Sequence, residues 1–99
     1  MVSPELDFHS AAIREARQAY RWYLRRSAGA ADRFRKALEA ALAQIIESPD
    51  RWPAYLYGTR YRLLRRFPFF VIYRIRADRL QVIAVAHYRK KPGYWKARK

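Results

Sequence analysis

The chain has 99 residues, which is enough for one domain with its own small core and argues against a division into two domains. Apolar residues make up 52% of the sequence and aromatic residues 16%, which argues against a disordered chain, because such chains carry too little apolar surface to bury. There are 22 Lys and Arg against 8 Asp and Glu, and the resulting net charge of +14 predicts an acidic partner.

The sequence contains no cysteine, which excludes disulfides, thiolate nucleophiles and cysteine-ligated zinc. The opening segment MVSPELDFHS lacks the basic and apolar regions of a secretory signal, and no run approaches the roughly 18 apolar residues of a membrane span. We therefore expect a cytoplasmic protein without a membrane partner. No pattern in the sequence indicates a metal site or a cofactor.

The first regular pattern is ELDF at residues 5–8, where polar and apolar residues alternate, as in a short strand. Ser10 follows it and is a suitable N-cap for a helix. From Ala11 to about Arg26, apolar residues recur at helical spacing and form one face. These residues are Ala12, Ile13, Ala16, Tyr20, Tyr23 and Leu24.

Two features of this first helix lie off its apolar face. Trp22 projects away from that face, and an exposed tryptophan indicates a protein partner. Four arginines share the opposite face, where a solvated helix surface is the simplest explanation and a site for an acidic partner is the alternative. The four arginines are Arg14, Arg17, Arg21 and Arg25.

A second helix is predicted from about residue 30 to 47, after a break at SAGAAD in which Gly29 suits a left-handed helix end. The short connection predicts an antiparallel helical hairpin over about residues 11–47. Pro49 stops the second helix. The segment SPDRWPAYLYGT holds two prolines and a glycine among aromatic residues, which predicts an ordered loop that packs through Trp52 and Tyr55.

The second half of the chain is rich in β-branched and aromatic residues. Its three apolar segments are separated by Pro68 and by a tight turn at residues 77–78, which predicts an antiparallel β-meander over about residues 60–88. The segment VIAVA at 82–86 is apolar on both faces and is expected in an interior strand. We predict an α+β fold, with the hairpin packed on an antiparallel sheet of three to four strands.

The remaining residues, 89–99, form a basic, aromatic tail. Pro92 and Gly93 predict a turn that folds Tyr94 and Trp95 back onto the body of the protein, since both side chains are costly to leave in water. We expect the last few residues beyond this turn to be mobile.

The segments RRFPF (65–69), IYRI (72–75) and AVAHYRKKPGYW (84–95), in this order of elements, resemble the RelE/ParE toxin superfamily and its ParE-like branch in particular. The resemblance covers nearly the whole chain. It implies a toxin of a type II toxin–antitoxin system that an acidic antitoxin wraps and neutralises. The ParE-like branch poisons DNA gyrase, whereas the RelE-like branch cleaves messenger RNA in the ribosome.

A ribonuclease without a metal needs a base, an acid and cations around the phosphate. The candidates here are His87 and Tyr88 with Arg65 or Arg62. The RelE-like ribonucleases carry an arginine on the middle strand where this chain has Phe70, which cannot stabilise a phosphorane. No catalytic residue is therefore favoured, and His87 is more simply explained by a hydrogen bond to nearby backbone.

The resemblance also implies where partners bind. The C-terminal part of ParE-like toxins acts on gyrase, which makes Arg89, Tyr94 and Trp95 the expected target-binding residues. We expect the antitoxin to contact Trp22, the four arginines of the first helix and an exposed sheet edge. A plain nucleic-acid-binding module remains a further alternative, since the net charge of +14 suits either partner.

Overall fold

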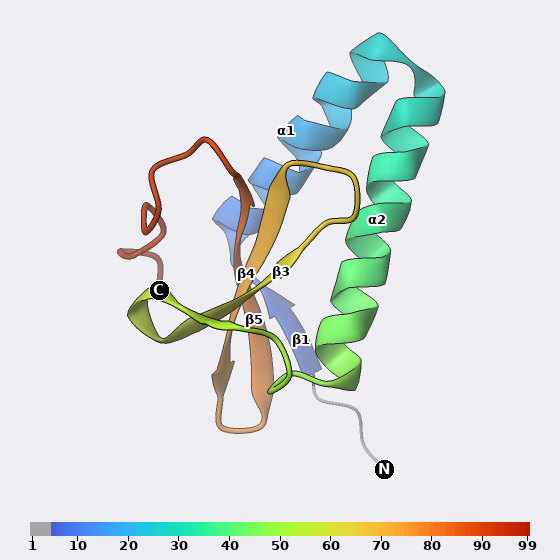
Figure 1. Ribbon diagram of the computed structural model, residues 1–99. Coiled ribbons are helices and arrows are strands. Elements are labelled where there is room, and N and C mark those ends of the chain that lie inside the picture. Colours follow the sequence, from blue (N-terminus) through green and yellow to red (C-terminus); the bar gives the residue numbers. More distant parts are fainter. Residues whose placement is uncertain (1–4) are drawn as a thin grey trace.

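The computed structural model describes residues 5–99, which form two helices packed on a five-stranded sheet (Figure 1). The predicted α+β class is confirmed, as are the N-terminal strand, the helical hairpin and the meander. No helix in the described part of the chain is long and apolar enough to cross a membrane. The elements are β1 (Glu5–Phe8), α1 (Ser10–Arg26), α2 (Ala28–Glu47), β2 (Ala54–Tyr55), a 3-10 turn (Leu56–Gly58), β3 (Thr59–Leu63), β4 (Phe69–Arg76) and β5 (Arg79–His87).

The sheet has the order β1-β5-β4-β3-β2 and is mixed. β3, β4 and β5 form the predicted antiparallel meander, with Phe70 opposite both Leu63 and Ala86. β1 runs parallel to β5, and β2 adds a two-residue antiparallel pairing with β3. The sequence predicts fewer strands and an antiparallel sheet because segments of two and four residues carry no periodicity that reveals their pairing. β5 is interior, as its apolar sequence indicates.

Two side-chain caps set the ends of the helices. His9 is the N-cap of α1, since its Nδ1 accepts a 3.0 Å hydrogen bond from the second helical N–H, and the predicted cap Ser10 is instead the first helical residue. Ser27 has an extended backbone, ends α1 and caps α2 through its Oγ at 3.0 Å. The prediction of a left-handed Gly29 is wrong, because Gly29 lies in the first turn of α2. One extended serine reverses the chain, so no glycine is required.

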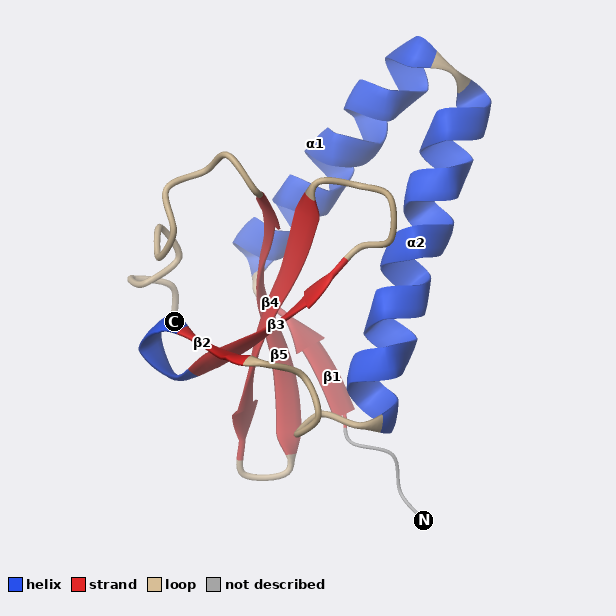
Figure 2. Ribbon diagram, viewed as in Figure 1, coloured by secondary structure: helices blue, strands red, loops and turns tan. Residues whose placement is uncertain are grey.

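The helices cover one face of the sheet (Figure 2). Tyr23 of α1 stacks on Phe34 of α2 at 5.3 Å between ring centroids, and Phe67 packs edge-on against both rings. Phe69, at the start of β4, completes the cluster at 5.4 Å from Phe34. This aromatic contact ties the hairpin to the sheet. Its buried neighbours are Ala12, Ala19, Ala41, Ile45, Leu64, Val71, Tyr73, Leu80, Val82 and Val85.

Part of the C-terminal segment, residues 88–99, covers the sheet face away from the helices (Figure 2). Trp95 is only 3% exposed and packs on Ile72 and Ile83. The turn that brings it there contains Gly93 with φ +85°, where an added Cβ would stand 2.7 Å from a ring carbon of Tyr57. The predicted inward fold of the tail is confirmed. The predicted loop contacts are confirmed too, because Trp52 joins the helix-side core and Tyr55 joins this second one.

Candidate partner-binding surfaces

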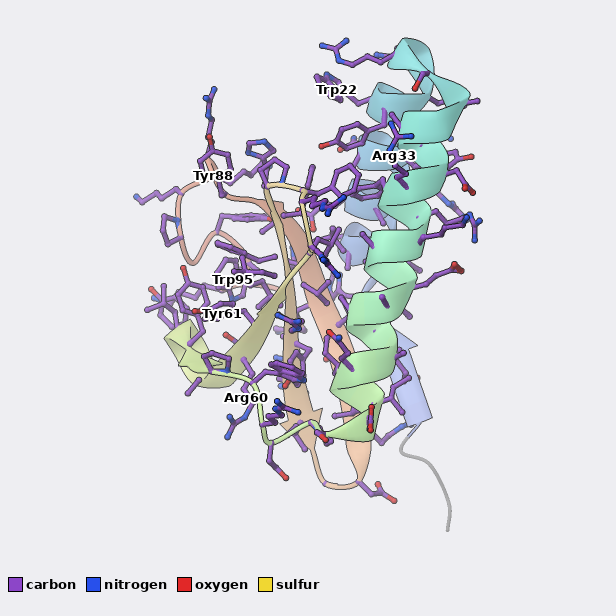
Figure 3. The ribbon with its side chains drawn as sticks, turned by 45° about the vertical axis from the view of Figure 1, so that its right-hand side comes forward. Trp22, Arg33, Arg60, Tyr61, Tyr88 and Trp95 are labelled. Carbon is purple, nitrogen blue, oxygen red and sulfur yellow. The ribbon has the colours of Figure 1, made fainter. Side chains whose placement is uncertain are left out.

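The surface of α1 carries a large exposed aromatic side chain, Trp22 (Figure 3). Trp22 is 46% exposed, its ring meets the edge of Tyr23 at 4.9 Å, and the Arg26 guanidinium lies 3.7 Å above it. These contacts hold the indole in one orientation without covering it. The four arginines predicted to share the opposite face are all exposed, and within residues 5–99 none forms an ion pair: Arg14, Arg17, Arg21 and Arg25.

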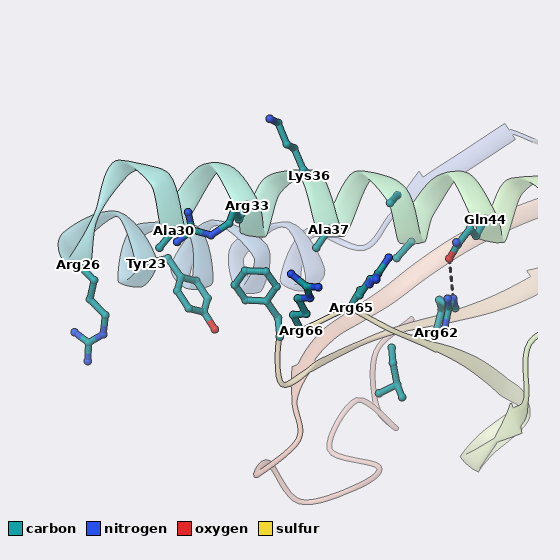
Figure 4. A pocket seen from close by; sticks show the side chains of 14 residues that line it. Tyr23, Arg26, Ala30, Arg33, Lys36, Ala37, Gln44, Arg62, Arg65 and Arg66 are labelled. Carbon is teal, nitrogen blue, oxygen red and sulfur yellow. Dashed lines mark hydrogen bonds between the residues drawn. The ribbon is translucent and has the colours of Figure 1, made fainter.

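A groove of about 950 Å³, here called the α2–β3 groove, separates α2 from β3 and the loop that follows it (Figure 4). Alanines of α2 form one wall, and Phe67 also lines the groove. Six cationic side chains line the groove, and no acidic side chain from the described residues does. The six are Arg26, Arg33, Lys36, Arg62, Arg65 and Arg66.

The six cations differ in how they are held. The Nε of Arg62 donates to the Gln44 Oε1 at 2.8 Å, and its guanidinium lies 4.2 Å from the Trp52 ring centroid. Lys36 pairs with Asp32 at 3.1 Å. Arg33, Arg65 and Arg66 have no acidic partner among the described residues. The positive charges that line the α2–β3 groove repel one another, so the groove favours an anionic occupant.

This groove was not predicted from the sequence, although α2 carries a signal for it. Ala30, Arg33, Ala37 and Gln44 recur at helical spacing, and all four line the groove. This second face of α2 alternates small and basic residues, so it does not stand out as an apolar stripe. This face lines a groove only because β3, from a distant part of the sequence, packs beside it.

The C-terminal segment is held by one acidic residue of α1, Glu15. Its carboxylate accepts hydrogen bonds from Arg98 at 2.8 and 3.0 Å, from the Tyr94 hydroxyl at 2.5 Å and from the Val85 N–H at 3.0 Å. Arg98 also donates to the Ile83 carbonyl at 2.9 Å. The last residues, expected to be mobile, are thus anchored by a partly buried ion pair.

The same contacts shift two pKa values. Burial raises the pKa of Glu15, but the hydrogen bonds from Arg98, Tyr94 and Val85 outweigh it and leave the pKa below its ordinary value. Burial, followed by the hydrogen bond to the Glu15 carboxylate, raises the pKa of Tyr94. The carboxylate therefore stays ionised and the phenol stays neutral as a donor.

The three residues predicted to bind the target occupy different environments. Arg89 is exposed, and its Nε donates to the Tyr88 hydroxyl at 3.1 Å. Tyr94 is half-buried, and its hydroxyl donates a hydrogen bond to the Glu15 carboxylate. Trp95 lies inside the second core, on the sheet face opposite α2 (Figure 3), so its side chain supports the fold in this conformation.

Three of the four residues of the ribonuclease alternative line two different grooves. His87 lines a groove beside α1, whereas Arg62 and Arg65 line the α2–β3 groove. The Nδ1 of His87 accepts the Arg89 N–H at 3.1 Å, which is the backbone hydrogen bond expected for it. Tyr88 is 52% exposed and stacks on His87 at 4.9 Å.

Comparisons with known proteins agree with this architecture. The family model of the ParE toxin of type II toxin–antitoxin systems, parDE, matches residues 6–92. The fold resembles a chain of the chromosomal ParDE system from P. aeruginosa with a TM-score of 0.64 and 16% identity, over 86% of this chain and 96% of that one. No curated protein sequence matches. The chain therefore belongs to the ParE toxin family of type II toxin–antitoxin systems.

Proposed function

We propose that this protein is a toxin that inhibits DNA gyrase by direct binding, that it acts in the cytoplasm, and that an acidic antitoxin neutralises it. The observation that favours binding over cleavage is that the ribonuclease candidates line different grooves: His87 lines one, and Arg62 and Arg65 line another. Acid–base cleavage needs these groups within hydrogen-bonding reach of one phosphate. A toxin that works by binding has no such requirement.

The exposed part of the C-terminal segment supports contact with the target. Tyr88 and Arg89 project from the end of β5, and their side chains are linked at 3.1 Å. The buried Trp95 and the Glu15–Arg98 pair hold this segment against the sheet. An ordered arginine and tyrosine pair is a common core of protein interfaces, because little side-chain entropy remains to be lost on binding.

Three features support an acidic antitoxin as the second partner. The α2–β3 groove holds six cations, and the arginines of α1 are free of ion pairs within residues 5–99. Beside the groove, β2 pairs only with Thr59 and Arg60, so the Leu63 end of β3 forms an edge of the sheet. An extended acidic segment that adds a strand there would place carboxylates near Arg65.

DNA supercoiling by purified gyrase tests the proposal. We expect the protein at stoichiometric or lower amounts to reduce supercoiling and to trap cleaved DNA. Because a basic protein also coats DNA, the assay is repeated at raised salt, which weakens that coating but leaves specific inhibition in place. Full supercoiling activity with the toxin in excess over gyrase would contradict the gyrase proposal.

A further inference from the structure

A second groove, here called the α1–tail groove, lies between α1, the adjoining ends of β4 and β5, and the C-terminal segment. Its volume is about 400 Å³, near the lower end of the roughly 300–1,000 Å³ typical of ligand pockets. The space suits one or two side chains and not a whole helix. It brings together Trp22, predicted to bind the antitoxin, and Tyr94, predicted to bind the target.

The interior of the α1–tail groove is apolar. Ala19, Phe69 and Val85 are at most 9% exposed and lie at its base, with Trp22 at one side. Among the residues that the structure describes, the only carboxylate that lines it belongs to Glu15, whose oxygens already accept four hydrogen bonds. An apolar side chain can therefore enter without leaving a polar group unsatisfied.

Two basic side chains lie against aromatic residues that line the groove. Lys90 lines it, with its ammonium 4.7 Å from the Tyr94 ring centroid, and the Arg26 guanidinium lies 3.7 Å from the Trp22 ring centroid. His87 also lines the groove, and since its Nδ1 accepts the Arg89 N–H, its Nε2–H is available as a donor. These groups suit carboxylates placed next to the apolar side chain.

We propose that the α1–tail groove is an anchor site for the antitoxin, in which one bulky apolar side chain flanked by carboxylates is seated. This inference rests on the proposed neutralisation by an acidic antitoxin. Because Lys90 and Tyr94 form one wall, a bound antitoxin covers the segment proposed to contact gyrase. The antitoxin and gyrase then compete for a single surface, which explains neutralisation without a change in the toxin's fold.

Two peptides of equal charge test the anchor, Ac-EELWEE-NH2 and Ac-EEAAEE-NH2. Each is titrated into the full-length protein while backbone amide NMR signals are followed. We expect the first peptide to bind about tenfold more tightly or better, and to shift the amides of Ala19, Val85 and Lys90. Equal affinities would show attraction by charge alone and would overturn the proposal.

Three variants test whether the α1–tail groove is where the apolar peptide binds. Gln18 is exposed and lines the groove, so Gln18→Trp fills the groove from within and is expected to abolish the preference for the apolar peptide. Tyr20→Trp places the same ring on α1 outside the groove and should keep the preference. Trp22→Ala removes a wall and should lower affinity for the apolar peptide at least fivefold.

Three other outcomes overturn the proposal. The first is that Gln18→Trp still binds the apolar peptide more tightly than the alanine peptide, and the second is that the peptide shifts only amide signals of the α2–β3 groove. The third is that the amide signals of Ala19, Val85 and Lys90 shift when the toxin concentration alone is raised, which would show a second copy in the groove. The supercoiling assay separates this inference from the proposed function. Gyrase inhibition without anchor-dependent binding refutes the groove alone, whereas anchor-dependent binding without inhibition refutes the gyrase target alone.

Discussion

The Glu15 carboxylate of α1 and the Arg98 guanidinium, 83 residues later, form a two-bond ion pair at 2.8 and 3.0 Å. Both side chains are less than one-fifth exposed. The pair fixes the C-terminal segment against α1 and completes one wall of the α1–tail groove through the neighbouring Tyr94. The shape of that groove therefore depends on a contact between the two ends of the chain.

Replacing Glu15 by Gln should release the C-terminal segment. The change leaves the Arg98 charge partly buried without its counter-ion, and removing one partner of such a pair costs about 3 kcal/mol. Urea denaturation should show this loss, and the amides of Lys96 and Arg98 should exchange faster with solvent. The matched control is Glu39→Gln, which removes a solvent-exposed pair with Arg35 and should leave the free energy of unfolding nearly unchanged. Unchanged exchange at Arg98 would contradict the role given to Glu15.

Acid should loosen the same contact. The pKa of Glu15 is lowered in the folded protein, so its contribution to stability is complete above its ordinary value of 4.5 and is lost as the pH falls through the lowered folded value. The free energy of unfolding should therefore fall more steeply below about pH 4.5 in the wild type than in Glu15→Gln. Hydrogen bonding to Arg35 also lowers the pKa of Asp32, but Asp32 titrates in both proteins. Equal slopes would contradict the prediction.

Substitutions of Trp95 and of Arg89 should distinguish a residue that supports the fold from one that contacts the target. Trp95→Ala empties the second core and should cost about 3–5 kcal/mol, with gyrase inhibition lost because the segment detaches. Arg89→Ala changes an exposed side chain and should leave the melting temperature nearly unchanged while it weakens inhibition. Thermal unfolding and supercoiling assays on both variants check this. Full inhibition by Arg89→Ala would remove Arg89 from the target interface.

Charge reversal should identify the α2–β3 groove as an anion site. Arg65→Glu places a negative charge among five cations and should weaken binding of a decaglutamate peptide about tenfold, or roughly 1.4 kcal/mol. The control Arg76→Glu makes the same charge change at the end of β4, outside the groove. Titrations at two salt concentrations measure both effects. Equal losses in the two variants would assign the attraction to net charge alone.

Ribosomes programmed with message should show no toxin-dependent cut sites. The Nδ1 of His87 is occupied by backbone, and Arg62 and Arg65 line a different groove. Primer extension on the message checks this, with a ribosome-dependent ribonuclease assayed in parallel. Cut sites that disappear in a folded His87→Ala variant would establish the ribonuclease alternative.

The sequence by itself determined the elements of this fold. Helical periodicity places α1 and α2, β-branched and aromatic runs place β3 to β5, and Pro92 with Gly93 indicates the turn of the tail. These signals are local, because each depends on residues a few positions apart that share one face or one turn. The exposure of Trp22 follows from the same periodicity.

Only the tertiary structure decided which of these residues act together. The Glu15–Arg98 pair joins residues at opposite ends of the chain, and the α2–β3 groove joins Arg33 to Arg65 across two elements. The position of Trp95 in the second core likewise depends on the face of the sheet that the tail covers. A long-range contact leaves no periodic trace in the sequence, since it forms only once separate elements pack together.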